Sequence, residues 1–135
     1  MLKNLTIDQE KIEEKLIEEI VSPFVRYDPK RKSIILLVEK TKNLKIPQKV
    51  LLCLFALKGW RFFDLKEIPP EEAMPKEIAL SIGENSSTVR NHLQVLRREG
   101  LIYKTNSGAY TILSHSAQRI KETIEGKETL EWKKK

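Results

Sequence analysis

Residues 75–113 constrain the fold more than any other segment, because the spacing of their apolar side chains changes twice. One helical stripe is followed by a second, and after Gly100 apolar and polar residues alternate as in strands, around a small polar turn. The two stripes are Ile78, Ala79 and Ile82, and then Val89, Leu93 and Leu96. The segment therefore predicts a helix, a turn, a second helix and a two-stranded hairpin.

Local signals place the ends of these two helices. The first is expected to begin at Pro75 and to end at residue 81 or 82, because Gly83 readily adopts the left-handed backbone conformation that ends a helix. The second is expected over residues 86–99, with Gly100 ending it. Three side chains are candidates for its amino-terminal cap, namely Asn85, Ser86 and Ser87.

The outer side of the second helix combines hydroxyl, guanidinium and amide groups. Its members are Ser86, Ser87, Thr88, Arg90, Asn91 and Gln94. Arginine pairs with guanine, asparagine and glutamine pair with adenine, and serine and threonine bond to bases or phosphates. No acidic residue lies between Thr88 and Arg98, although an ordinary solvated helix can show such a gap by chance. We therefore expect double-stranded DNA as a partner.

The hairpin that follows has a polar tip. Lys104, Thr105, Asn106 and Ser107 are expected to form this tip, beside Gly108. As a wing, the tip would contact the DNA backbone or the minor groove beside the second helix. The alternative is a turn that only connects two strands.

The stretch STVRNHLQVLRREGLI resembles the recognition helix and first wing strand of winged helix-turn-helix transcriptional regulators, above all the ArsR type and more loosely the MarR type. The resemblance covers about 40 of the 135 residues. It rests on Ile78, Ala79, Gly83, Ser87, Thr88, Val89, His92, Leu93, Leu96, Gly100 and Leu101. It implies that residues 86–94 lie in the major groove and that Arg97 and Arg98 lie nearer the phosphates.

Two departures from the ArsR pattern bear on regulation. Metal sensors of this type carry paired cysteines on an early helix, whereas this chain has a single cysteine, Cys53. Residues 1–45 also differ from an ordinary ArsR amino terminus.

We expect a mainly α fold with a small β component (α+β), comprising an extension over residues 1–45, a winged helix-turn-helix over 46–113 and a carboxy-terminal helix and basic tail over 114–135.

The extension is expected to hold a helix and a hairpin. Residues 7–21 place isoleucine and leucine on one face and glutamate on the other, and Pro23 ends the pattern. Residues 24–39 are expected to form a hairpin, or at least one buried strand. The basic run 30–32 at the tip is either a solvated turn or a phosphate contact. Pro47 is suited to begin a core helix, and we expect an extended aromatic segment after its cap, Gly59.

The last helix is expected within residues 114–132, capped by Ser114 or Ser116 and broken at Gly126. It and the acidic first helix are candidates for the seam of a homodimer, because an apolar stripe outside the winged core needs a partner. The alternative is that these helices pack on their own domain. A dimer would read two half-sites about one helical turn of DNA apart.

Composition excludes several classes of protein. With 40% apolar residues and a net charge of +6, the 135 residues suffice for one core and favour an anionic partner. No apolar run approaches the ~20 residues of a membrane span, so we expect a cytoplasmic protein. The abundance of lysine, glutamate and isoleucine suits a heat-adapted source.

Neither a metal site nor an enzyme is expected. Cys53 lies in the apolar run VLLCLFAL and reads as a buried thiol, His92 as a structural residue and His115 as a surface residue. There is no phosphate-binding glycine loop and no catalytic set of residues, so we expect no cofactor. The competing function is a winged-helix module for protein contact within a transcription or replication complex.

Overall fold

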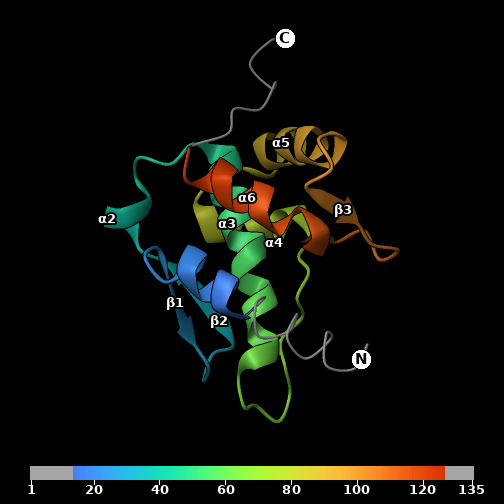
Figure 1. The fold of residues 1–135 in the computed structure, drawn as a ribbon. Helices are drawn as coiled ribbons and strands as arrows, with labels where there is room; N and C mark the ends of the chain where they lie inside the picture. The colour runs from blue at the N-terminus through green and yellow to red at the C-terminus, as the bar shows by residue number, and fades with distance from the viewer. Residues whose placement is uncertain (1–13, 127–135) are drawn as a thin grey trace, which may run out of the picture.

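The computed structural model describes residues 14–126, and it has a mainly α fold with two small antiparallel hairpins, as the sequence predicts (Figure 1). The amino-terminal helix is described over residues 14–21. The parts of the predicted first and last helices that fall in residues 1–13 and 127–135 lie outside the described residues. The elements that follow are β1 Val25–Asp28, β2 Ser33–Leu36, α2 Val38–Thr41, α3 Ile46–Lys58, α4 Pro75–Ile82, α5 Ser86–Arg98, β3 Ile102–Lys104, β4 Tyr110–Ile112 and α6 Ala117–Ile124, with short 3-10 helices η1 Gly59–Phe62 and η2 Ser114–Ser116.

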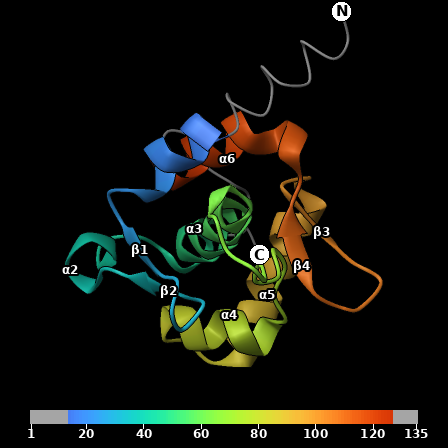
Figure 2. The same cartoon turned by 90° about the horizontal axis from the view of Figure 1, so that it is seen from below.

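Helix α3 is the centre of the molecule, as its nearly continuous apolar sequence predicts. Pro47 stands in its first turn, and every residue from 50 to 56 is at most 1% exposed. Viewed along α3, the other elements surround it, with the amino-terminal helix and α6 on one side and α4 and α5 on the other (Figure 2). One hydrophobic core therefore includes residues from all three predicted segments, such as Ile17, Leu51 and Ile120.

Helices α4 and α5 form the predicted helix-turn-helix. Gly83 ends α4 with a φ of 75°, a conformation that glycine adopts without steric cost. Of the three candidate caps for α5, Asn85 is the one used, because its side-chain oxygen accepts a 2.8 Å hydrogen bond from the Thr88 backbone N–H. Helices α3, α4 and α5 pack against one another, which fixes α5 to the core.

The hairpin of β3 and β4 follows α5, and its register pairs Ile102 with Ile112. A third backbone segment extends it, because Ala73 exchanges two hydrogen bonds of 3.0 and 2.8 Å with Tyr110. Periodicity gives no sign of this pairing, since Ala73 follows the Pro69-Pro70 loop and stands alone between irregular residues. The pairing joins the segment just before α4 to β4, the second strand of the hairpin.

The hairpin of β1 and β2 is also confirmed, with Val25 opposite Leu36. The single helical turn α2 after it is not predicted by the sequence pattern. The amino-terminal helix lies beside α6, and the Glu19 carboxylate is 3.9 Å from the Lys121 ammonium group (Figures 1 and 2). Among the described residues there is no helix of the length and apolarity that crossing a membrane requires.

The expected extended segment after α3 is wrong. Gly59 has a right-handed φ of −71°, and the chain continues into the 3-10 helix η1. Packing explains why a 3-10 turn forms in place of an extended segment, because this turn buries Trp60 completely. The centre of the Trp60 ring lies 5.0 Å from that of the Tyr27 ring, in an edge-to-face arrangement. Trp60 therefore packs in the interior of the fold.

The expected cap of the last helix is also corrected. Ser116 precedes α6, but its hydroxyl makes no cap and donates a 2.8 Å hydrogen bond to the Gly100 carbonyl oxygen. Ile120 and Ile124 of α6 are at most 1% exposed and pack in this chain's own core. Packing on the chain's own domain is thus what the described residues show, and a dimer through these helices stays a prediction.

Candidate nucleic-acid interface

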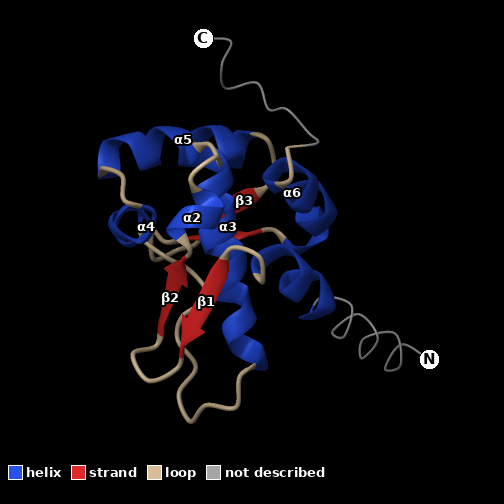
Figure 3. Cartoon of the chain, turned by 90° about the vertical axis from the view of Figure 1, so that its left-hand side faces the viewer, coloured by secondary structure: helices blue, strands red, loops and turns tan. Residues whose placement is uncertain are grey.

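Helix α5 lies along one outer edge of the molecule (Figures 1 and 3). Its inner side consists of Val89, Leu93 and Leu96, each 0% exposed, as the sequence stripe predicts. Burying these three side chains against α3 and α4 anchors the helix. The packing of the inner side therefore keeps the outer side of α5 at the surface, and the outer side chains are not needed to hold the helix in place.

All the residues of α5 that are predicted to contact DNA lie on this outer side or in the first turn of the helix. The exposed members are Ser87, Arg90, Asn91, Gln94, Arg97 and Arg98, and the half-buried members are Ser86 and Thr88. No element within residues 14–126 covers these exposed side chains.

The most informative property of this side is that most of its polar side chains have no bonding partner within the described residues. Within residues 14–126, the side chains of Arg90, Asn91 and Gln94 form no hydrogen bond or ion pair. The same holds for the guanidinium groups of Arg97 and Arg98. Guanidinium and amide groups carry several donors and acceptors each, so this surface presents many hydrogen-bonding groups that the fold itself does not use.

The charge around α5 is one-sided. The helix contains no acidic residue, and the carboxylate of Glu99, just after it, accepts a 2.9 Å hydrogen bond from Arg119 of α6. His92 is half-buried, and burial lowers its pKa, an effect that the nearby charge of Glu84 opposes. The imidazole is therefore neutral at neutral pH, and Arg90, Arg97 and Arg98 give this side its positive charge.

The four residues predicted to form the wing tip fall into two pairs, one with side chains bonded within the fold and one without such hydrogen bonds. The Thr105 hydroxyl donates to the Ala109 carbonyl oxygen at 3.1 Å, and the Ser107 hydroxyl donates to the Glu72 carboxylate at 3.0 Å. These two side chains hold the shape of the tip. Asn106 and Lys104 are exposed, with the Lys104 ammonium group 6.0 Å from the centre of the Tyr110 ring. Of the exposed residues in the predicted tip, Lys104 and Asn106 have side chains that form no hydrogen bond within the described residues.

The basic run 30–32 does not belong to this surface. The tip of the β1–β2 hairpin lies at the opposite end of the molecule from α5 (Figure 3). Lys32 lies 3.2 Å from the Glu67 carboxylate, and Arg31 lies 3.9 Å from Asp28. The run is an exposed turn, and a phosphate contact there stays a prediction.

The three candidate metal ligands do not form a site. Cys53 is 1% exposed inside α3, and burial raises its thiol pKa to about 12. His92 lies on α5, and His115 is exposed in η2, as predicted. In residues 14–126 there is no group of three or more histidine, cysteine, aspartate or glutamate side chains arranged to hold a metal ion.

Two contacts that position the site were missed by sequence reasoning. Arg119 donates hydrogen bonds to both the backbone and the carboxylate of Glu99 at the end of α5. Glu72 accepts from the wing, as described above. Both join residues far apart in the sequence, and a single sequence carries no signal of such pairs.

Comparison of the chain with protein-family models, with curated proteins and with solved structures found no match in any of the three.

Proposed function

We propose that this protein is a sequence-specific, double-stranded DNA-binding transcriptional regulator that places α5 in the major groove. The observation that carries the proposal is the outer side of α5, where arginine, asparagine and glutamine side chains are exposed and unbonded within the described residues. The likeness of residues 87–102 to the recognition helix and wing of ArsR-type regulators supports it.

The dimensions and chemistry of α5 suit this role. An α-helix with its side chains is about 10–12 Å across, and the major groove of B-DNA is about 12 Å wide. Arg90 offers the two parallel donors that bind guanine O6 and N7, and Asn91 and Gln94 offer the donor and acceptor that bind adenine N6 and N7. Base reading is assigned to these three residues.

The residues at the ends of the surface suit backbone contacts. Arg97 and Arg98 stand in the last turn of α5, and Lys104 and Asn106 are exposed on the wing. Their contacts would fix the orientation of α5 in the groove without reading sequence. Ser87 and Thr88 stand in the first turn of α5, and their hydroxyl groups would contact a phosphate or a base edge.

A protein-contact module in a transcription or replication complex is the second candidate, and exposed apolar side chains favour it. Leu80 on α4 is 82% exposed and Val38 on α2 is 75% exposed. Large apolar residues at such exposure are common singly and become informative only as a contiguous patch. DNA binding remains the first proposal because it accounts for five unbonded polar side chains on one helix.

The salt dependence of binding separates the two candidates. We would measure the affinity for a pool of duplexes by fluorescence anisotropy at about 50 and 200 mM salt. Four phosphate contacts per chain predict a loss of about a hundredfold between these concentrations for a bound monomer, and of about ten-thousandfold for a bound dimer. Negligible affinity for duplex DNA at both concentrations would contradict the proposal and favour the protein-contact module.

A dimer is part of the proposal. Sequencing the duplexes that bind would show its symmetry, because a dimer with two copies of α5 selects a palindrome whose half-sites are about 10 base pairs apart. A consensus with a single half-site would indicate that the chain binds as a monomer.

A further inference from the structure

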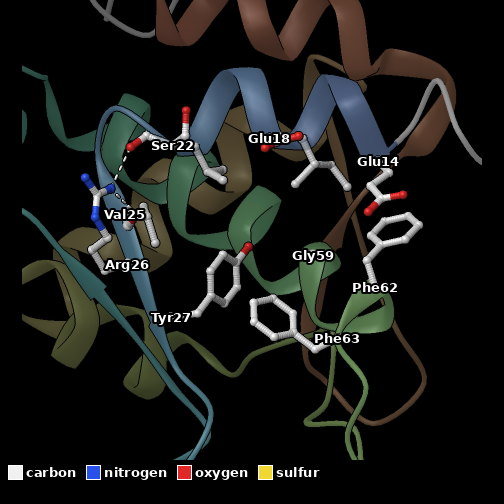
Figure 4. Close-up of a pocket in the computed structure, with 11 residues that line it drawn as sticks. Glu14, Glu18, Ser22, Val25, Arg26, Tyr27, Gly59, Phe62 and Phe63 are labelled. Carbon is white, nitrogen blue, oxygen red and sulfur yellow. Dashed lines mark hydrogen bonds between the residues drawn. The ribbon is translucent and has the colours of Figure 1, made fainter.

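A cavity of about 410 Å³ lies between the amino-terminal helix, β1 and η1 (Figure 4). It takes no part in the proposed DNA contact, because none of its lining residues belongs to α5 or to the wing. Its volume falls in the range of about 300–1,000 Å³ that small-molecule sites occupy. The apolar part of its lining consists of Ile17, Val21, Val25, Tyr27, Phe62 and Phe63.

The aromatic wall of the cavity is fixed in place. The Tyr27 hydroxyl donates a hydrogen bond to the Ala56 carbonyl oxygen, and its ring lies 4.8 Å from that of Phe63 and 5.0 Å from that of Trp60. Gly59 permits this arrangement, because a Cβ atom there would overlap the Tyr27 hydroxyl. Burial raises the Tyr27 pKa, so the hydroxyl remains a neutral donor. The wall is thus preformed, which lowers the entropic cost of binding a ligand.

Two carboxylates face this wall from the amino-terminal helix. Glu14 and Glu18 both line the cavity, and Figure 4 shows them on the side opposite Tyr27 and Phe63. They are four residues apart, so they are neighbours on one helix face and repel each other. Within residues 14–126 neither carboxylate forms a hydrogen bond or an ion pair, whereas the adjacent Glu19 faces Lys121.

The cation that also lines the cavity is accounted for. The Arg26 guanidinium donates hydrogen bonds of 2.6 and 2.9 Å to the carbonyl oxygens of Ser22 and Val25 (Figure 4). It therefore closes the end of the helix and does not reach Glu14 or Glu18. The two carboxylates give this apolar cavity a net negative charge on a chain whose total charge is +6.

We propose that this cavity binds a small amphipathic organic cation, with an aromatic or aliphatic body packed against Tyr27, Phe62 and Phe63 and an ammonium group between Glu14 and Glu18. Aromatic side chains pack well against an aromatic or aliphatic body, and a carboxylate pair at the edge of an apolar site favours an ammonium group over a neutral or anionic one. The proposal does not depend on DNA binding.

Two probes of similar shape and opposite charge test it, namely 4-phenylbutylamine and 5-phenylpentanoate. Isothermal titration calorimetry on the full chain is expected to show the amine binding at least about tenfold more tightly than the carboxylate. The positive charge of the whole chain favours the carboxylate in non-specific binding, so a preference for the amine reports the cavity. Absence of amine binding, or equal binding of both probes, would overturn the proposal.

The double variant Glu14→Gln, Glu18→Gln locates the site. It is expected to bring the two affinities to within about twofold while retaining the fold, because both side chains are exposed. The matched control is Glu39→Gln, Glu67→Gln, which removes the same charge at exposed positions outside the cavity and is expected to keep the preference. A preference that survives in the first variant, or is lost in the control, would show that Glu14 and Glu18 do not determine binding.

Discussion

Helices α5 and α6 are both amphipathic and both pack on α3, but they use their polar sides in opposite ways. On α6, Arg119 binds Glu99, Lys121 faces Glu19, and Thr123 donates to the Arg119 carbonyl oxygen. On α5, Arg90 and Asn91 have no side-chain partner within the described residues. The same residue type, arginine, thus joins elements of the fold on one helix and faces outward on the other.

This difference supports the proposal that α5, and not α6, has a role beyond stability. The contacts within the chain account for the polar side chains named on α6. They do not account for those of α5, whose apolar side alone suffices to hold it in place. Under the proposed function, the guanidinium group and the two amides along this basic helix would bind the hydrogen-bonding groups of base edges.

The apolar sides of the two helices are expected to contribute equally, and the largest effects should appear there. Leu93→Ala on α5 and Ile120→Ala on α6 each remove a side chain that is 0% exposed. Each is expected to lower the free energy of unfolding by about 2–5 kcal/mol, measured by urea denaturation. A loss below about 1 kcal/mol for only one of them would show that the two helices are not anchored alike.

Substitutions on the polar sides of the two helices are expected to have different effects on the affinity of the protein for DNA. Arg90→Ala and Asn91→Ala should each weaken binding to the selected duplex by about 1–3 kcal/mol, because a bidentate contact to a base is lost. Fluorescence anisotropy at fixed salt measures this. Gln118→Ala, an exposed amide on α6, is the matched control and should bind as the unaltered protein does. Equal affinities for all four proteins would break the comparison.

For the free energy of unfolding, the substitution on α6 is expected to have the larger effect and the substitution on α5 the smaller one. Arg119→Ala is expected to lower the free energy of unfolding by about 1 kcal/mol, since it removes partly exposed hydrogen bonds to Glu99. Arg90→Ala is expected to change it by less than about 0.5 kcal/mol, as surface substitutions usually do. Denaturation of both variants under one condition compares them, and a larger loss for Arg90→Ala would contradict the assignment.

The smallest expected effect is a pH dependence from α5. Because burial lowers the pKa of His92 below the ordinary 6.5, the folded state binds fewer protons there than the unfolded state. Its contribution therefore lowers stability as the pH falls below about 6.5 toward the folded-state pKa. Between about pH 7 and 5, His92→Gln should lose less stability than the unaltered protein. His115→Gln is the control, and an identical pH profile for His92→Gln would show that burial of the ring is unimportant.

The sequence predicts the elements well where one apolar stripe determines them. The stripe of Val89, Leu93 and Leu96, the Gly83 turn and the core helix from Pro47 are all present as expected. Prediction fails where distant residues decide the conformation, as at Trp60, whose burial against Tyr27 turns an expected extended segment into a 3-10 helix. Exposure of the candidate site was predictable from helical spacing, whereas the Arg119 contact with Glu99 was not.

The claim that α5 reads base edges is tested most directly by repeating the selection of bound duplexes with Asn91→Ala. The account predicts a consensus that is relaxed at one or two base pairs in each half-site and unchanged elsewhere, because only the contacts of that side chain are lost. A consensus identical to that of the unaltered protein, obtained at equal stringency, would contradict it.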